Sequence, residues 1–110
     1  MTYAEYFSSV KTRFMGADVS DIREHLAYQF NVIGEESGIF YVEVKNGELF
    51  VEPYEYYDRD VMFTATAKTF TDLMEGKLDP VLAFTLQKLK VEGNFDKALM
   101  LNDLIKRAAK

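Results

Sequence analysis

The side chains that could do chemistry are few in this sequence, and their spacing favours no catalytic site. His25 is the only histidine, and it stands beside Glu24 in a segment that we predict to be helical. A general base needs a positioned partner, and a lone histidine on a helix is more often a surface or capping residue. The serines have no nucleophile-elbow context, and the chain has no cysteine. We therefore expect no catalytic residue and a protein that is not an enzyme.

Four acidic residues in the middle of the chain are the only grouping that could suggest a metal site. They are Glu52, Glu55, Asp58 and Asp60. Their spacing matches no calcium or magnesium loop motif, and an acidic connection between strands is usually only solvated. The glycines stand at expected turns and helix ends, without the spacing that cradles a phosphate. We therefore expect no metal and no cofactor.

Composition favours one small domain that handles an apolar molecule. The chain has 110 residues, of which 48% are hydrophobic and 15% aromatic, and its formal net charge is -5. This length supports one core, so we expect a single domain over residues 1–110. The acidic balance excludes the basic stripe that nucleic-acid binding needs. The aromatic surplus suggests an internal cavity or an apolar contact surface.

The absence of cysteine fits a reducing compartment, and no apolar run reaches the roughly 20 residues of a membrane-spanning helix. We therefore expect a cytoplasmic protein whose contact with membranes is transient.

The first quarter of the chain has a helical period. Its apolar residues recur at the spacing of one helix face: Tyr3, Tyr6, Phe7, Val10 and Phe14. They predict an amphipathic helix over residues 2–15 that ends at Gly16. Asp18 and Asp21 favour a short second helix over residues 19–25. Residues 1–25 are therefore expected to form an N-terminal helical segment.

The period then changes to two, which predicts strands. The alternating apolar residues are Tyr28, Phe30 and Val32, then Phe40, Val42 and Val44, then Leu49 and Val51, then Val61, Phe63 and Ala65. Asn46 and Gly47 are typical of a type I′ hairpin turn, which needs positive φ at both central residues. This pattern predicts an antiparallel sheet with one solvated face.

Helices dominate the rest of the chain. Thr66 is a suitable N-cap for a helix that ends at Gly76, and Asp79 followed by Pro80 opens a helix over residues 80–87. A short strand around residues 89–91 and a closing helix over residues 95–108 follow. The fold class is therefore α+β, with a five-stranded, mainly antiparallel sheet and helices covering one of its faces.

A series of short motifs adds a family resemblance. The motifs are VKNG at residues 44–47, DVMFT at 60–64, LMEGKLDP at 73–80, AF at 83–84 and KLKVEGN at 88–94. In this order they resemble the sterol carrier protein 2 family, and the likeness covers residues 30–105. The chain is most similar to the small stand-alone members found in prokaryotes. It departs from the family at residues 85–87, where relatives often carry an aromatic residue, Gln and Gly.

The resemblance implies an elongated apolar cavity between the sheet and the helices, and non-catalytic binding and transfer of a fatty acyl, isoprenoid or sterol-like lipid inside the cell. The apolar residues that we expect to line the cavity are Phe63, Phe70, Leu73, Met74, Leu82, Leu86, Leu99 and Leu104.

An alternative function remains open, because some prokaryotic relatives are accessory factors of isoprenoid-quinone pathways. In that alternative the chain is a module that docks on an enzyme of a lipid or quinone pathway, or on a second copy of itself. Tyr54, Tyr56 and Tyr57 are candidate contacts for it, since exposed tyrosine is favoured at interfaces.

Overall fold

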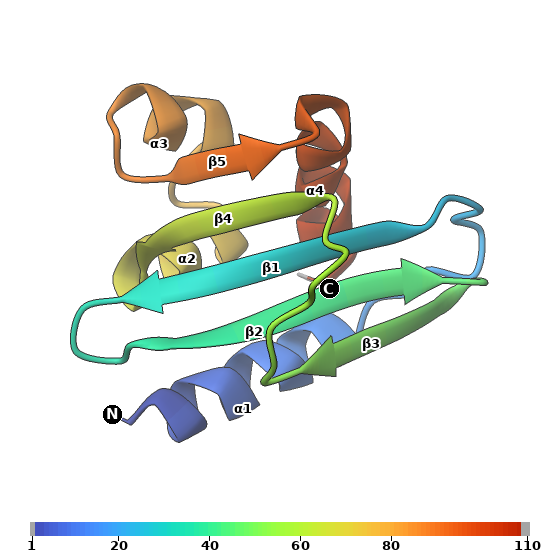
Figure 1. Cartoon of the computed structure of the whole chain (residues 1–110), viewed down its shortest axis with the longest axis horizontal. Coiled ribbons are helices and arrows are strands. Elements are labelled where there is room, and N and C mark those ends of the chain that lie inside the picture. Colours follow the sequence, from blue (N-terminus) through green and yellow to red (C-terminus); the bar gives the residue numbers. More distant parts are fainter. Residues whose placement is uncertain (1, 109–110) are drawn as a thin grey trace.

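The computed structural model describes residues 2–108. Their elements are, in chain order, α1 (Tyr3–Met15), β1 (Leu26–Ile33), β2 (Gly38–Lys45), β3 (Glu48–Glu52), β4 (Val61–Thr66), α2 (Ala67–Met74), α3 (Pro80–Thr85), β5 (Lys90–Gly93) and α4 (Phe95–Ala108) (Figure 1). The five strands form one sheet in the order β3-β2-β1-β4-β5. The predicted α+β class and the mainly antiparallel sheet are confirmed.

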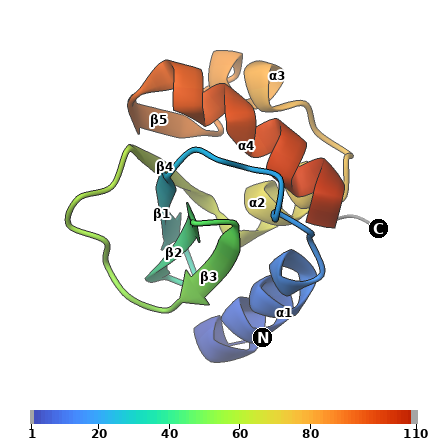
Figure 2. The same ribbon diagram turned by 90° about the vertical axis from the view of Figure 1, so that its right-hand side faces the viewer.

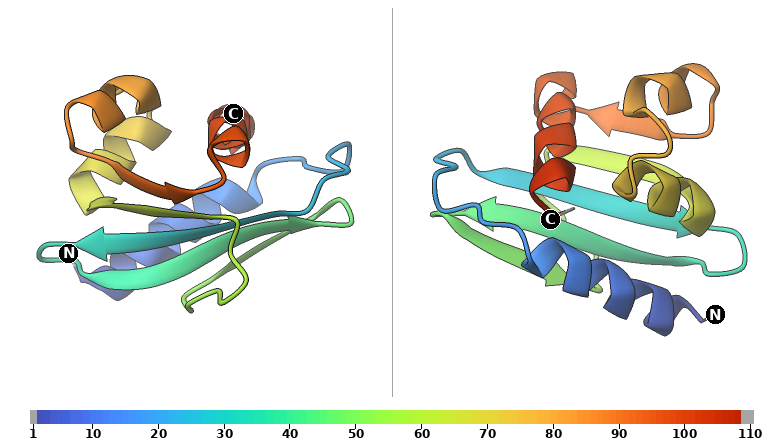
Figure 3. Two further views of the ribbon diagram at one scale, coloured as in Figure 1. Left: turned by 45° about the horizontal axis from the view of Figure 1, so that its top comes forward. Right: turned by 180° about the vertical axis from the view of Figure 1, so that it is seen from behind.

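The helices α1, α2 and α4 lie on one side of the sheet, as predicted (Figures 2 and 3). Helix α1 packs against β3, whereas α2 and α4 pack against β4. Each helix turns an apolar stripe inward, for example Tyr6, Val10 and Phe14 of α1, which are all buried. The main core therefore lies between the sheet and this helical layer.

One pair of strands, β1 and β4, is parallel, whereas the other three neighbouring pairs are antiparallel. Because β1, β2 and β3 form a meander, β3 runs in the same direction as β1. The chain must then return to the starting end of β1 before β4 can pair alongside it. Residues 53–60 make this return across the face of the sheet that those helices leave open (Figures 1 and 2). The parallel pair is therefore a consequence of where this connection runs.

The hairpin between β2 and β3 forms at the predicted turn. Asn46 and Gly47 have φ angles of 54° and 74°, as a type I′ turn requires. Lys45 and Glu48 are the last paired residues on either side of it. This turn places Val42 and Val44 opposite Val51 and Leu49 on the apolar face.

The predicted second helix over residues 19–25 is wrong, because this segment forms turns and a bend. The backbone N–H and the hydroxyl of Ser20 both donate to the side chain of Asp18. Arg107 of α4 donates to the carbonyl of Asp18, at 2.9 Å, and to the carboxylate of Asp21. Seven residues are few for a stable helix. The carboxylate of Asp21 and the backbone carbonyl of Asp18 therefore hold the segment against α4.

A row of stacked phenylalanine rings occupies the centre of the core. Phe30 of β1 pairs in register with Phe40 of β2 and with Phe63 of β4. Its ring centroid lies 4.8 Å from that of Phe40 and 5.3 Å from that of Phe63. Phe70 of α2 meets the Phe30 ring edge-on at 5.4 Å. Such aromatic pairs stabilise a core beyond the area that they bury.

The opposite face of the sheet is polar and holds the returning loop. The hydroxyl of Tyr56 donates to Glu43 at 2.6 Å, and the backbone N–H of Tyr56 donates to Gln29 at 3.1 Å. His25 is not helical, and its Nε2 pairs with the same Glu43 carboxylate. Tyr56 therefore fastens the loop to the sheet, whereas Tyr54 and Tyr57 stay exposed.

We predict that Gly93→Ala is strongly destabilising. Gly93 has a φ of 115°, and an added Cβ would collide with the carbonyl oxygen of Asp60. Gly76 is the matched control, because its φ of 75° is also positive but nothing lies within 4 Å of an added Cβ. Urea denaturation should show a loss of about 3 kcal/mol or more for Gly93→Ala and about 1 kcal/mol for Gly76→Ala. Equal losses would contradict the steric argument.

We also predict that Tyr56→Phe costs about 1 kcal/mol of unfolding free energy at neutral pH, because it removes the hydrogen bond to Glu43. That hydrogen bond raises the pKa of Tyr56 from 10 to about 12. The stabilisation is therefore fully present below pH 10 and is lost as the pH rises through 12. The difference between wild type and variant should shrink over this range in urea denaturation. Tyr57→Phe, at a side chain that is 89% exposed, should change nothing.

Candidate functional site

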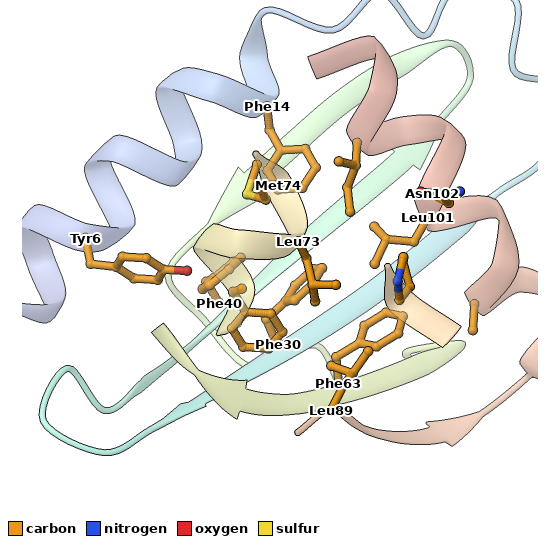
Figure 4. A pocket seen from close by; sticks show the side chains of 14 residues that line it. Tyr6, Phe14, Phe30, Phe40, Phe63, Leu73, Met74, Leu89, Leu101 and Asn102 are labelled. Atoms are coloured by element: carbon orange, nitrogen blue, oxygen red, sulfur yellow. The ribbon is translucent and has the colours of Figure 1, made fainter. Parts of the chain in front are cut away.

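An apolar pocket of about 40 Å³ lies between the sheet and the helices (Figure 4). Its floor is the phenylalanine row of Phe30, Phe40 and Phe63. Phe70, Leu73 and Met74 of α2 line it, together with Leu101 and Ile105 of α4 and with Phe14 of α1. Tyr6 and Asn102 are the only polar side chains among its lining residues, and none of these residues is charged. The pocket therefore suits a hydrocarbon group.

Local sequence signals hold α2 and α3 around this pocket. The hydroxyl of Thr66 accepts a hydrogen bond from the N–H of Thr69 at 3.2 Å and so caps α2. Asp79 caps α3 in the same way by accepting from the N–H of Leu82 at 3.0 Å, and Pro80 follows as the first helical residue. The two short helices can therefore begin at fixed points beside the sheet.

Helix α4 is fixed at its start. The side chain of Asn94 accepts from the N–H of Lys97 at 3.1 Å, and the buried Tyr28 donates its hydroxyl to the carbonyl of Lys97 at 2.6 Å. The ammonium group of Lys97 lies 3.1 Å from the carboxylate of Asp60. The same carboxylate accepts from the N–H of Ala27 at 2.9 Å. These contacts join α4 to the beginning of β1 and thereby position Ala98 and Leu101 over the pocket.

A wider apolar groove of about 270 Å³ adjoins the pocket on the outside of the molecule. The pocket and the groove share the side chains of Phe63, Pro80, Leu89 and Ala98. The outer walls of the groove come from two helices and consist of Val81 and Phe84 of α3 and Phe95 and Leu99 of α4. All four of these side chains are exposed. The groove and the pocket are therefore adjacent spaces, with these four shared side chains between them.

Four of the eight expected wall residues line the pocket, namely Phe63, Phe70, Leu73 and Met74. Leu99 lies outside the pocket, on the wall of the groove. Leu104 is buried in the core without lining either space, and Leu82 and Leu86 are exposed at 48% and 52%.

The inward side of α3 explains the position of these last two leucines. Ala83 of α3 is fully buried, whereas Leu82 and Leu86, four residues apart, share another face of the helical turn. A run of apolar residues as short as Val81–Leu86 does not reveal which face turns inward. The structure therefore brings Ala83, and not the larger leucines, toward the core.

The sequence analysis missed several lining residues, namely Tyr6, Phe14, Phe30, Phe40, Leu89, Leu101 and Ile105. A signal existed for Phe30 and Phe40, because they belong to the same alternating apolar face as Phe63. The helical period of α1 likewise placed Tyr6 and Phe14 on the buried stripe. What the sequence did not show is that α1 and α4 reach the same pocket from opposite sides.

The arrangement offers a binding site without visible covalent or metal chemistry. Among the described residues, no group of three or more histidine, aspartate or glutamate side chains is placed to hold a metal ion. None of the helices within residues 2–108 is both long enough and apolar enough to cross a membrane. His25 and Glu43 pair on the opposite face of the sheet from the aromatic row, beneath Tyr56.

Comparison with known proteins identifies relatives of this chain. Hydroxysteroid dehydrogenase-like protein 2 of Rattus norvegicus is 35% identical over 79 residues, which cover 71% of this chain and 15% of the relative. The chain therefore spans only a small part of that longer protein. The likeness locates a shared domain and does not extend to the rest of the relative.

Solved structures share the fold. The solution structure of palmitated SCP2L2 from Aedes aegypti matches with a TM-score of 0.67 and 21% identity, covering 96% of this chain and 95% of that one. A ubiquinone synthesis protein, UbiJ-SCP2, matches with a TM-score of 0.63 and 17% identity, covering 91% of this chain and 77% of that one. At these identities the likeness concerns the fold.

The family model described as "SCP-2 sterol transfer family" matches residues 16–106, which include the whole sheet, the phenylalanine row and the groove. Sequence motifs, strand order and the helical layer over the sheet agree with this match. The chain belongs to the SCP-2 sterol transfer family.

Proposed function

We propose that this protein is a non-catalytic carrier that binds one lipid molecule and transfers it between membranes or proteins. The observation that supports this most directly is that an apolar pocket shares four lining side chains with an apolar groove that opens to the surface. A small buried pocket can arise from imperfect packing alone. A ligand site must also be accessible from the surface. The palmitated state named for the Aedes aegypti relative supports the same proposal.

The dimensions of the site favour a slender ligand. The pocket measures about 40 Å³ and the groove about 270 Å³, so together they reach the lower end of the range of about 300–1,000 Å³ for ligand sites. A flexible acyl or isoprenoid chain can enter a narrow pocket and leave its remainder in the groove. A rigid, fused ring system needs the wider space all along its length. An acyl or isoprenoid chain is therefore the preferred ligand.

Hydrophobic burial alone supplies useful affinity. Each methylene removed from water contributes about 0.8 kcal/mol, so a sixteen-carbon chain contributes on the order of 13 kcal/mol before costs are subtracted. Association costs about 4–15 kcal/mol in lost freedom. Because the pocket has no charged lining residue, the net affinity depends on the aromatic and aliphatic walls, with Phe63, Phe70, Leu73 and Met74 inside and Leu99 at the opening.

We predict that Ala98→Phe weakens lipid binding at least tenfold. Ala98 lines both the pocket and the groove, so a larger side chain there would obstruct the passage between them. The matched control is Ala4→Phe, which makes the same change at an exposed position of α1. Affinity is measured by titrating each variant with a fluorescent single-chain lipid, and the fold by circular dichroism. Equal affinities for the two folded variants would contradict the proposed route.

A second candidate function is that of an accessory module that docks on another protein of a lipid or quinone pathway. The observation that favours it is the apolar surface of α3, where Leu82 and Leu86 are exposed beyond the walls of the groove. Exposed apolar side chains that gather on one element typically mark a contact surface. UbiJ-SCP2, which shares the fold, is described as a ubiquinone synthesis protein. A second copy of this chain is the partner that can be tested directly, because a two-fold interface needs only one self-complementary surface.

We predict that Leu82→Glu separates these two functions. Leu82 lines neither the pocket nor the groove, so its replacement should leave lipid affinity within about twofold of wild type. If α3 forms a contact between copies, the buried charge should weaken self-association by more than tenfold in sedimentation velocity. Thr85→Glu, at an exposed and already polar position of α3, is the control. A wild-type chain that stays monomeric at millimolar concentration would contradict the self-docking function.

A further inference from the structure

The hydroxyl of Tyr6 is a buried polar group without a hydrogen-bond partner among the described residues. The side chain is only 4% exposed and comes from the N-terminal half of α1. The great majority of buried side-chain donors in folded proteins are paired, so each exception requires an explanation. Phenylalanine at this position would fill the same space without the hydroxyl. The Thr71 hydroxyl is near but makes no hydrogen bond of standard geometry with Tyr6, so the Tyr6 hydroxyl can donate to a bound molecule.

The hydroxyl is directed into the lipid site. Tyr6 is a lining residue of the pocket, and its oxygen points from α1 toward Phe40 and Met74 (Figure 4). Burial raises the pKa of Tyr6 to about 12, and the neighbouring Thr71 hydroxyl offsets only part of this effect. The phenol is therefore neutral at physiological pH and can donate its proton to a hydrogen bond.

We infer that Tyr6 is the polar anchor of the site and that it selects lipids that carry a neutral carbonyl oxygen at one end. Esters, ketones, aldehydes and quinone-type rings provide such an acceptor. This inference rests on the proposed lipid-carrier function and specifies the class of lipid. One donor in an otherwise apolar pocket is the typical means by which a ligand site sets orientation and specificity.

A neutral acceptor fits better than a carboxylate. Among residues 2–108, no lysine, arginine or histidine lines the pocket, and an ionised carboxylate buried without a cation is strongly disfavoured. Arg13 of α1 lines an adjacent polar crevice between α1 and α2, which Tyr6 and Met74 also line, and its guanidinium donates to the carbonyl of Met74 at 3.1 Å. The cation on that side is therefore already engaged outside the pocket.

The position of Tyr6 also sets the direction in which the lipid lies. Tyr6 stands at one end of the pocket, and Phe63 and Leu89, which are shared with the groove, stand at the other (Figure 4). A lipid whose carbonyl reaches Tyr6 must extend its hydrocarbon chain toward Phe84 and Phe95 at the opening. The polar end therefore enters first and leaves last.

The test compares three ligands of equal chain length, namely a long-chain methyl ketone, the corresponding alkane and the fatty acid. Each competes with a bound fluorescent hydrocarbon probe on wild type, on Tyr6→Phe and on Tyr3→Phe. Tyr3 is the control, because its hydroxyl donates to the carbonyl of Ile39 and it does not line the pocket. Wild type and Tyr3→Phe should prefer the ketone to the alkane by about three- to tenfold, which one hydrogen bond supplies.

Tyr6→Phe should lose this preference of the ketone over the alkane, whereas a purely structural role of Tyr6 would change the affinity for both ligands by the same factor. In isotope-edited infrared spectra, the carbonyl stretch of the bound ketone should lie lower in wild type than in Tyr6→Phe. A preference that persists in the variant, or a fatty acid that binds more tightly than the ketone, would overturn the inference and leave the carrier function standing. A wild-type protein that binds neither the probe nor the alkane would overturn the carrier function itself.

Discussion

The stacking of Phe30 between Phe40 and Phe63 is the interaction on which the rest of the structure depends. It requires three strands to meet in one register, and a slip of one residue in β1 would turn the Phe30 ring to the opposite face. The row is at once the centre of the core and the floor of the pocket. Stability and the candidate binding surface therefore depend on the same three side chains.

The parts of the fold that depend on residues adjacent in the sequence were predictable. Asn46 and Gly47 specify their turn because positive φ at both positions is a local requirement. Asp79 and Pro80 likewise begin α3 without reference to the rest of the chain. The segment 19–25 was not predictable, because the carboxylate of Asp21 is paired with Arg107, more than eighty residues later. The residues that line the pocket were only partly predictable. Burial of Ala83 determines which face of α3 turns toward the core, and this depends on tertiary packing.

The two faces of the sheet differ in the kind of side chain that they carry. One face is apolar, and the helices cover it so that hydrocarbon contacts dominate. The other face joins His25, Glu43 and Tyr56 in a network that fastens the returning loop. Polar residues on this face thus stabilise the connection, whereas the lining of the candidate pocket on the other face is mainly apolar.

The parallel pairing of β1 with β4 also has a kinetic consequence. Strands β1, β2 and β3 pair through short connections, whereas Tyr28 and Val61 meet across a long stretch of chain. Loop-closure entropy makes such distant pairing slow to form. The floor of the pocket lacks Phe63 until this step is complete, so an unfinished chain has no site to fill. A lipid that binds as we propose would therefore recognise only fully folded molecules and would shift the population toward the folded state.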